Sequence, residues 1–173
     1  MPPHDVFVGV GSNIDPEANV PRALERLAEE VRLRAVSTFY RTEPIGRPEE
    51  APFLNGVVRL DTDRGAHGLK RDVLCVIEAE LGRARTGDAY AARTIDLDIL
   101  LFDDAIIRNS ELYIPSPDIR RRVFVAAPLL ELAPGLVLPG AGAPLASAPC
   151  VKDCAALVPV QDFTNALRER LKL

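Results

Sequence analysis

The sequence predicts an α+β fold in which helices pack on an antiparallel sheet, and three observations support this prediction. Segments with strand periodicity and segments with helix periodicity alternate along the chain. Two strand-like segments, residues 31–42 and 53–62, are separated only by a proline-rich loop, as expected for neighbouring antiparallel strands. The stretch GVGSN at residues 9–13 has neither the spacing of a dinucleotide-binding loop nor the lysine of a P-loop, which argues against the nucleotide-binding α/β folds.

Each element is predicted from its pattern of apolar residues and its flanking glycines and prolines. In chain order, we expect strand 5–11, a helix from about Asn19 to residue 31, strand 31–42, strand 53–62, helix His67–Leu81, strand 93–102, a short helix within 123–133 and a final helix 163–171. The polar loops that remain are residues 43–52, 82–92 and 113–123. Because chemistry usually sits on loops, these three segments are candidates for a site.

The two long helices are predicted from the spacing of their apolar residues. The first helix would be capped near Asn19, with Pro21 in its first turn, where a missing N–H costs little. The second helix would end at Gly82. It carries its apolar residues at helical spacing, namely Leu69, Val73, Val76, Ile77 and Leu81. No repeat and no long linker interrupts these elements, so the sequence predicts one domain over residues 1–173.

The sequence RTIDLDILLF at residues 93–102 places two aspartates in an otherwise apolar strand. Strand side chains alternate between faces, so Asp96 and Asp98 share one face, roughly 7 Å apart at Cα. Two carboxylates at that distance repel unless a cation neutralises them. A metal site would explain the pair, and an exposed strand face with solvated charges is the alternative.

Composition limits the class of protein and of partner. The chain has 173 residues, 47% of them hydrophobic and a net charge of −4, which does not favour binding to nucleic acid or to an anionic membrane. No apolar run is long enough to span a membrane, and the N-terminal residues lack the pattern of a secretory signal. The three cysteines are odd in number and spaced wrongly for a zinc knuckle. They indicate reduced thiols, and we expect a cytoplasmic protein.

Arginines cluster around the aspartate strand and after the third loop. Arginine binds phosphate oxygens through paired hydrogen bonds, and Mg²⁺ bridges phosphates to one or two carboxylates. Together with the aspartates, these arginines predict a polyphosphate site, although solvated surface charge explains any one of them alone. The clustered arginines are Arg83, Arg85, Arg93, Arg120, Arg121 and Arg122.

Two phenylalanines, Phe53 and Phe124, each have a polar residue two positions away in the sequence. Phe53 and Asn55 share a strand face, and a planar heterocycle stacked on Phe53 and read by the Asn55 amide would explain them. Phe124 and Arg122 have the same spacing and could supply the other side of a sandwich. A core phenylalanine beside a turn-facing asparagine is the alternative for the first pair.

The chain resembles the 6-hydroxymethyl-7,8-dihydropterin pyrophosphokinase family along nearly its whole length. The segments that carry the resemblance are GVGSN, STFYRTEPIG, FLNGVV, IEAELGRAR, RTIDLDILLF and RRRVFVAAPLLELAP, in this order and spacing. The resemblance implies a ferredoxin-like sandwich. It also implies an enzyme of folate biosynthesis that transfers pyrophosphate from MgATP to the hydroxymethyl group of 6-hydroxymethyl-7,8-dihydropterin and releases AMP.

The resemblance further implies a role for each matching residue. Asp96 and Asp98 match ligands of two Mg²⁺ ions, and Arg83 and Arg93 join them as catalytic residues. The positions matching pterin-binding residues are Thr42, Ile45, Phe53, Asn55 and Phe124. Those matching ATP-binding residues are Glu78, Arg83, Arg85, Arg93, Ser116 and Arg122. We also expect ATP as co-substrate, a monomer, and no partner beyond the small-molecule substrates.

One position departs from the family pattern. Ser116, in PSP, stands where the family usually has a histidine that contacts ATP phosphate. Loss of one preorganised donor to developing phosphate charge typically costs about 10²-fold in rate. Two rival functions stay open: pyrophosphate transfer to a different hydroxymethyl heterocycle, and a non-catalytic pterin- or nucleotide-binding protein. Release of AMP from ATP in the presence of Mg²⁺ and hydroxymethyldihydropterin separates the three.

Overall fold

A computed structural model describes residues 1–84, 87–88 and 91–173. The strands are β1 His4–Ser12, β2 Arg32–Val36, β3 Tyr40–Thr42, β4 Phe53–Thr62, β5 Asp96–Phe102, β6 Ile107–Arg108, β7 Tyr113–Ile114 and β8 Val158–Pro159. The α-helices are α1 Pro16–Ala28, α2 Ala66–Gly68, α3 Cys75–Glu80, α4 Asp118–Arg121, α5 Val123–Leu132 and α6 Gln161–Leu171. A π-helix, Leu69–Leu74, joins α2 to α3, and 3₁₀ turns cover Leu145–Ser147 and Pro149–Ala156.

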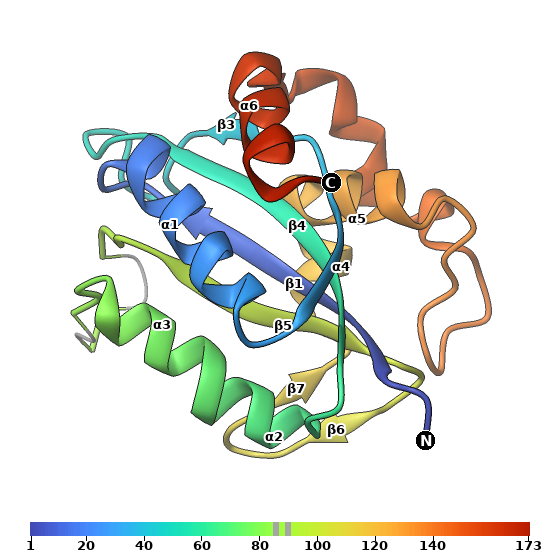
Figure 1. The fold of residues 1–173 in the computed structure, drawn as a ribbon. Helices are drawn as coiled ribbons and strands as arrows, with labels where there is room; N and C mark the ends of the chain where they lie inside the picture. The colour runs from blue at the N-terminus through green and yellow to red at the C-terminus, as the bar shows by residue number, and fades with distance from the viewer. Residues whose placement is uncertain (85–86, 89–90) are drawn as a thin grey trace.

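The main sheet is antiparallel, and β1 and β4 are neighbouring inner strands. Its order is β5-β1-β4-β3-β8, and β2 pairs with β4 beyond the end of β3. Counting β2 and β3 as one interrupted strand, β1, α1, β2/β3, β4, α3 and β5 follow the βαββαβ order of a ferredoxin-like fold (Figure 1). The predicted α+β class and the antiparallel sheet are confirmed.

The sheet buries a different apolar cluster on each face. On one face, Val6, Val8 and Val10 of β1 pack against α1, the α2–α3 segment and Leu167 of α6. On the other face, Phe7 of β1 belongs to a smaller cluster with residues of α4 and α5 (Figure 1). Since side chains alternate along β1, Gly9 and Gly11 continue the face that carries Phe7.

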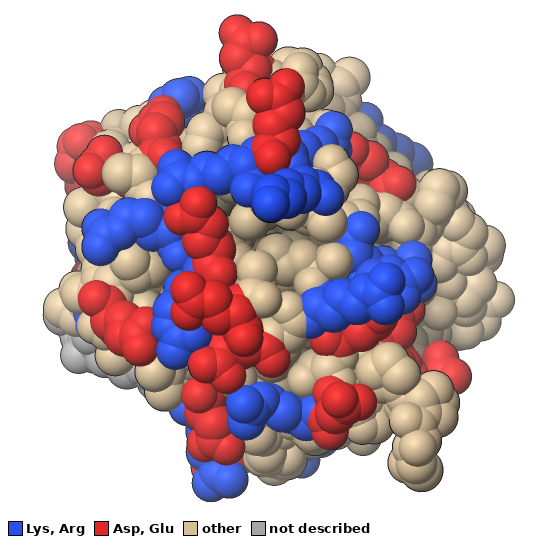
Figure 2. Space-filling model, viewed as in Figure 1, with Lys and Arg blue, Asp and Glu red and all other residues tan. Residues whose placement is uncertain are grey.

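The face covered by α1 and α3 carries acidic and basic side chains side by side (Figure 2). Many of these charges are paired: Arg26 contacts Glu29, Glu30 and Glu80, and Arg170 contacts Glu25. Exposed pairs of this kind stabilise a fold by at most about 1 kcal/mol each. This face therefore presents mixed charge rather than a broad patch of one sign.

The first helix begins earlier than the sequence predicted. It starts at Pro16, with Asp15 as the capping residue in a left-handed conformation, and Pro21 lies inside it. The predicted cap, Asn19, is buried in the first turns, where its side-chain amide donates to the Ile14 carbonyl at 2.7 Å. Asn19 therefore lies inside the helix, and its side chain gives a hydrogen-bond donor to a carbonyl of the turn that precedes the helix.

The predicted strand 31–42 is interrupted. β2 ends at Val36 and β3 begins at Tyr40, and between them the Ser37 hydroxyl accepts from the N–H of Val57 at 2.9 Å. The segment leaves the sheet there so that Phe39 becomes fully buried. Gly56 of β4 makes room for the Phe39 ring, because a Cβ on Gly56 would lie 2.7 Å from it.

The second helix spans the predicted residues but contains the π-helical turn Leu69–Leu74. This turn shifts the buried face, which carries Leu69, Val73, Leu74 and Ile77, whereas Val76 is 39% exposed. The predicted apolar role of Val76 is therefore wrong. Gly82 ends the segment with a positive φ of 78°, as predicted.

The strand β5 follows the predicted alternation only as far as Ile99. Its pairing with β1 shifts between Phe7 and Val8, so Leu100 and Leu101 both pack in the smaller cluster. Leu101 was predicted to share the face of Leu97, and the bulge moves it to the other face. The shift lies beyond the two aspartates and leaves their common face unchanged.

Three short strands were not predicted, namely β6, β7 and β8, and α4 lies within a predicted loop. The predicted α5 is confirmed, and the final helix begins two residues earlier than predicted, at Gln161. Among the described residues, Cys75, Cys150 and Cys154 form no disulfide, as expected for reduced thiols. Within the described residues, no helix is long and apolar enough to cross a membrane.

Candidate active site

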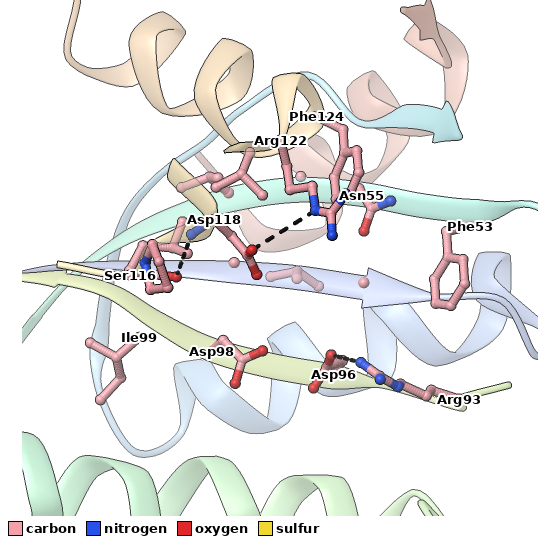
Figure 3. Close-up of a pocket in the computed structure, with 18 of the residues that line it drawn as sticks. Phe53, Asn55, Arg93, Asp96, Asp98, Ile99, Ser116, Asp118, Arg122 and Phe124 are labelled. Atoms are coloured by element: carbon pink, nitrogen blue, oxygen red, sulfur yellow. Dashed lines mark hydrogen bonds and ion pairs between the residues drawn. The ribbon is translucent and has the colours of Figure 1, made fainter. Parts of the chain in front are cut away.

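A pocket of about 420 Å³ lies on the sheet face that carries Gly9 and Gly11. It opens where α5 no longer covers the sheet, and α4 and α5 border one side of it (Figure 3). Gly9 and Gly11 form its floor on β1 because they bring no side chain to this face. The sheet is therefore hollowed between its neighbouring strands β4 and β5.

Strand register places functional side chains in rows across this floor. Gly11 pairs with Asn55 of β4 on one side and with Asp96 of β5 on the other. Gly9 pairs with Val57 and Asp98 in the same way. Strands lie about 4.8 Å apart, so Asn55 and Asp96 face each other across β1 at roughly 10 Å. An amide and a carboxylate thus border one glycine-lined hollow.

The β4 side of the pocket is formed mainly by uncharged side chains, although Glu43 also lines the pocket there, and we call it the neutral side. It comprises Thr42, Ile45, Phe53, Asn55 and Phe124. Phe53 and Phe124 come from different elements, β4 and α5, and both are partly exposed to the pocket (Figure 3). The Asn55 amide donates to Thr42 Oγ1 at 2.6 Å, which fixes its orientation. Two rings and one fixed amide suit a flat heterocycle with polar edges.

Gly11 is required for this arrangement. A Cβ on Gly11 would lie 2.7 Å from Asn55 Oδ1 and 3.9 Å from the Phe53 ring. Any larger residue would therefore push the amide out of position. Gly11 of the GVGSN segment is therefore needed for close packing against Asn55, and not for a phosphate-binding loop.

The β5 side is charged, and we call it the charged side. It comprises Lys70, Arg83, Arg93, Asp96 and Asp98. Asp96 and Asp98 point to the same side of the sheet, as predicted (Figure 3). Their exposures differ, because the side chain of Asp96 is 15% exposed and that of Asp98 is 60% exposed.

Asp96 lies at the centre of a buried ionic network. Arg83 Nη1 is 2.7 Å from Asp96 Oδ1 and 2.5 Å from Glu78 Oε1, and Arg93 donates to Asp96 Oδ2. Burial raises the pKa of Asp96, and the charge of Asp98 adds to this, while Arg83 and Arg93 act in the opposite direction. The two arginines therefore stabilise the charged form of Asp96, which burial and the neighbouring Asp98 disfavour.

Glu78 supports the network from beneath the pocket. It is 1% exposed, and its Oε1 accepts from the Leu97 N–H at 2.8 Å. Leu97 is the residue between the two aspartates, so this bond from α3 fixes the strand that carries them. Glu78 does not line the pocket.

The sequence analysis missed Lys70, which lines the pocket from the π-helical turn. Its ammonium donates to the Leu97 carbonyl at 2.8 Å and to Asp98 Oδ1 at 3.1 Å. Burial opposes its charge, but Asp98 and Glu78 outweigh burial and raise the pKa of Lys70. The available signal was a lysine four residues before Leu74 and seven before Ile77, on the apolar stripe of the helix.

The third loop brings Ser116, Asp118 and Arg122 to the pocket (Figure 3). The Ser116 N–H donates to the Leu100 carbonyl at 2.9 Å, which ties this loop to the end of β5. The Ser116 hydroxyl accepts a long hydrogen bond from the Asp118 N–H at 3.4 Å. Arg122 Nε lies 3.9 Å from Asp118 Oδ1.

The structure brings most of the predicted site residues to one pocket. Those that line it are Thr42, Ile45, Phe53, Asn55, Arg93, Asp96, Asp98, Ser116, Arg122 and Phe124. Glu78 and Arg83 lie behind the aspartates, and Arg85 lies outside the described residues. Sequence reasoning missed Lys70, Gly11 and Asp118 as pocket residues.

The charged side has the donor chemistry that Mg²⁺ prefers. Of the described residues, none donates a well-aligned hydrogen bond to the buried Asp96 Oδ1, although Arg83 lies close to it. No group of three or more acidic, histidine or cysteine side chains converges in the part of the chain that the structure describes. Two carboxylates fit Mg²⁺, which keeps several waters and takes further ligands from phosphate.

Comparison with known proteins gives consistent results. The profile of the family 7,8-dihydro-6-hydroxymethylpterin-pyrophosphokinase (HPPK) matches residues 7–134. The 2-amino-4-hydroxy-6-hydroxymethyldihydropteridine pyrophosphokinases of Methylorubrum extorquens and Pseudomonas aeruginosa are similar to this chain. The first is 41% identical over 137 residues, covering 78% of this chain and 85% of the relative. The second is 42% identical over 138 residues, covering 78% and 83%.

Solved structures share the fold. One described as the HPPK-DHPS in complex with substrates has a TM-score of 0.67 at 12% sequence identity. The match covers 100% of this chain and 45% of the other, so the chain spans less than half of that protein. A Plasmodium falciparum HPPK-DHPS triple mutant with pteroate also gives a TM-score of 0.67, at 12% identity, covering 97% of this chain and 46% of that one.

Proposed function

The chain belongs to the 7,8-dihydro-6-hydroxymethylpterin-pyrophosphokinase family, and from this premise we propose how its pocket carries out the family's reaction. The protein is a pyrophosphokinase of folate biosynthesis. It transfers pyrophosphate from ATP to the hydroxymethyl group of 6-hydroxymethyl-7,8-dihydropterin and releases AMP.

The row Asp96, Gly11, Asn55 is the observation that carries this assignment to particular residues. It supports pterin binding on the neutral side, between Phe53 and Phe124, with the Asn55 amide reading the ring edge. Thr42 and Ile45 would complete that side. It equally supports phosphate binding on the charged side, and the hydroxymethyl group would lie between the two, above the glycines.

Mg²⁺ would be held by Asp96 and Asp98, which match the ligands of two ions in the family, and it would neutralise phosphate charge when bound.

 Arg93 lines the pocket and would bind the phosphates, and Arg83, which pairs with Asp96 from behind, would join it by family resemblance. Arg122 and Ser116 would contact them from the opposite wall, and Glu78 would act by fixing β5. Transfers of this kind depend on positioning and charge neutralisation, so a dedicated general base is not required.

We further propose that residues 1–173 form one domain and act as a monomer. The C-terminal segment beyond the family match supports the single domain, because Thr164 Oγ1 of α6 accepts from the N–H of Phe39 at 3.0 Å and Leu167 belongs to the main core. A cytoplasmic location remains an expectation from the reduced cysteines.

The test is direct. The purified protein is incubated with ATP, Mg²⁺ and 6-hydroxymethyl-7,8-dihydropterin, and AMP is measured by chromatography. We expect AMP and the pterin pyrophosphate in equal amounts, and neither product without the pterin or in excess chelator. ADP in place of AMP, or no product at all, would contradict the proposal.

A further inference from the structure

Lys70 is a pocket residue whose chemistry the proposed function leaves unused. Its side chain is 18% exposed and it borders the same pocket as Asp96 and Asp98. The sequence contains only two other lysines, Lys152 and Lys172, both exposed and away from the pocket. Burying an ammonium is costly unless the site gives it partners, so its position needs an explanation.

The backbone at Lys70 is unusual. Lys70 lies in the π-helical turn Leu69–Leu74, between the α-helical segments α2 and α3. Single π-helical turns are rare and occur frequently at functional sites, because the extra residue redirects the side chains of one turn. Here the turn buries Leu69, Val73 and Leu74 while Lys70 reaches the outer edge of β5.

The contacts of Lys70 account for only part of its capacity to donate. An ammonium has three N–H donors. Among the described residues, Lys70 Nζ has two acceptors, the Leu97 carbonyl at 2.8 Å and Asp98 Oδ1 at 3.1 Å. One donor is therefore left for a ligand, and a second becomes available if Asp98 changes partner.

The pocket repeats the same arrangement three times. Lys70 is paired with Asp98, Arg93 with Asp96, and Arg122 with Asp118. Each cation approaches the pocket from a different element, and each is matched to a carboxylate. A polyphosphate with its metal brings both anions and cations, so it can take over both members of such a pair.

We propose that Lys70 is a phosphate-binding residue that donates its ammonium hydrogen bonds to the polyphosphate of the nucleotide. The inference rests on the proposed function, which places MgATP on the charged side. In the structure, Asp98 accepts from the ammonium at the pocket wall. When metal and nucleotide bind, Asp98 serves the metal and Lys70 turns to the phosphate oxygens, while its bond to the Leu97 carbonyl keeps it at the edge of β5.

The experiment measures binding rather than turnover. Calorimetry compares the wild type with Lys70→Met, using Mg²⁺ and an ATP analogue whose α and β phosphorus atoms are joined by a methylene group. We expect the affinity to fall about 10- to 100-fold, the scale of a hydrogen bond between charged groups. Binding of Mg²⁺ with inorganic tripolyphosphate should weaken by a similar factor, and pterin affinity should stay unchanged.

Two variants serve as controls. Lys152→Met removes the same charge from an exposed site and should bind the analogue as the wild type does. Lys70→Arg keeps a cation at the site and should recover most of the lost affinity. If Lys70→Met fails to fold, Lys70→Gln keeps an N–H donor for the Leu97 carbonyl and carries the same expectation.

Two results would overturn the inference. If Lys70→Met binds the analogue as tightly as the wild type, or more tightly, Lys70 only neutralises Asp98 and secures the strand edge. If analogue affinity falls but tripolyphosphate affinity does not, Lys70 contacts the nucleoside. The proposed function fails on a different result, the absence of AMP from the wild type, so the two failures are distinguishable.

Discussion

The neutral and charged sides of the pocket lie on the same floor and are built in opposite ways. On the neutral side, the Asn55 amide is fixed by a single hydrogen bond to Thr42 and by close packing against Gly11. On the charged side, Asp96 and Asp98 are held by Arg83, Arg93 and Lys70.

This difference indicates how each side receives its ligand. The neutral side is complete before the pterin arrives, so binding there replaces water by ring contacts. On the charged side, the cations and carboxylates are paired with one another. These pairs must separate when the carboxylates bind metal and the cations bind phosphate. Substitutions should therefore act selectively, on pterin affinity from one side and on nucleotide affinity and rate from the other.

The largest expected effect comes from removing a carboxylate of the charged side. Asp98→Ala should lower the rate of AMP formation by about 10³-fold or more, because a metal contributes several kcal/mol to transition-state stabilisation. Asp96→Ala should do the same. Pterin affinity, measured by calorimetry, should change by less than about threefold, because residues that share no partners with the pterin side have little effect on it.

The matched control is Asp104→Ala, which removes an exposed aspartate from the turn after β5. It should retain the wild-type rate. Near-normal AMP formation by both Asp96→Ala and Asp98→Ala would contradict the metal assignment. A loss of pterin affinity equal to the loss of rate would break the separation between the two sides.

The next largest effect is expected on the free energy of unfolding, from a substitution of Glu78 beneath the charged side. Glu78→Ala removes the buried acceptor of the Leu97 N–H and leaves Arg83 with one carboxylate fewer. Removing one member of a buried pair typically costs about 3–5 kcal/mol, so the free energy of unfolding should fall by about 3 kcal/mol, since Arg83 keeps its contact with Asp96. Urea denaturation measures this change.

Glu80→Ala is the control, because Glu80 lies on the same helix and pairs with Arg26 at the surface. Its loss should change stability by no more than about 1 kcal/mol. Equal stability of Glu78→Ala and the wild type would mean that the network is dispensable for folding.

A smaller effect is expected on the neutral side. Phe124→Ala should weaken pterin binding by about 1–3 kcal/mol, through loss of ring stacking and of apolar contact area. The affinity for the methylene ATP analogue should barely change. Calorimetry that showed nucleotide binding lost and pterin binding kept would reverse the assignment of the two sides.

The smallest predicted effect is a gain. Ser116→His should raise kcat about tenfold, because a longer and partly charged donor can reach the phosphate that carries developing charge. The gain should fade at alkaline pH as the imidazole loses its proton. An unchanged kcat across the pH range would indicate that other cations of the pocket already do this work, and pterin affinity should stay constant in either case.

Much of this site was accessible from the sequence because it depends on local alternation. The common face of Asp96 and Asp98, and that of Phe53 and Asn55, follow from the two-residue period of a strand. The strand β4 was predicted with its observed bounds because its apolar pattern runs unbroken between a proline and a polar turn. Placing these two pairs opposite each other required the register with β1, which no local pattern contains.

The errors come from places where packing overrides the local period. The bulge opposite Phe7 and Val8 moved Leu101 to the other face, and burial of Phe39 divided the predicted strand 31–42. Lys70 was missed although its spacing places it on the apolar stripe of the helix, because its partners on β5, Leu97 and Asp98, lie far along the chain. In each case the deciding contact joins residues far apart in the chain.

The position of β1 between β4 and β5 also has a consequence for biosynthesis. β1 is made before both of its sheet neighbours, since β4 and β5 follow it by many residues. At about 5–20 residues per second, residues 96–102 follow β1 after roughly 4 to 18 s. During that interval its valines and unpaired backbone groups lack their final partners, which is the condition under which nascent strands aggregate. The strand that forms the floor of the pocket is therefore the one that most needs protection while the chain is being made.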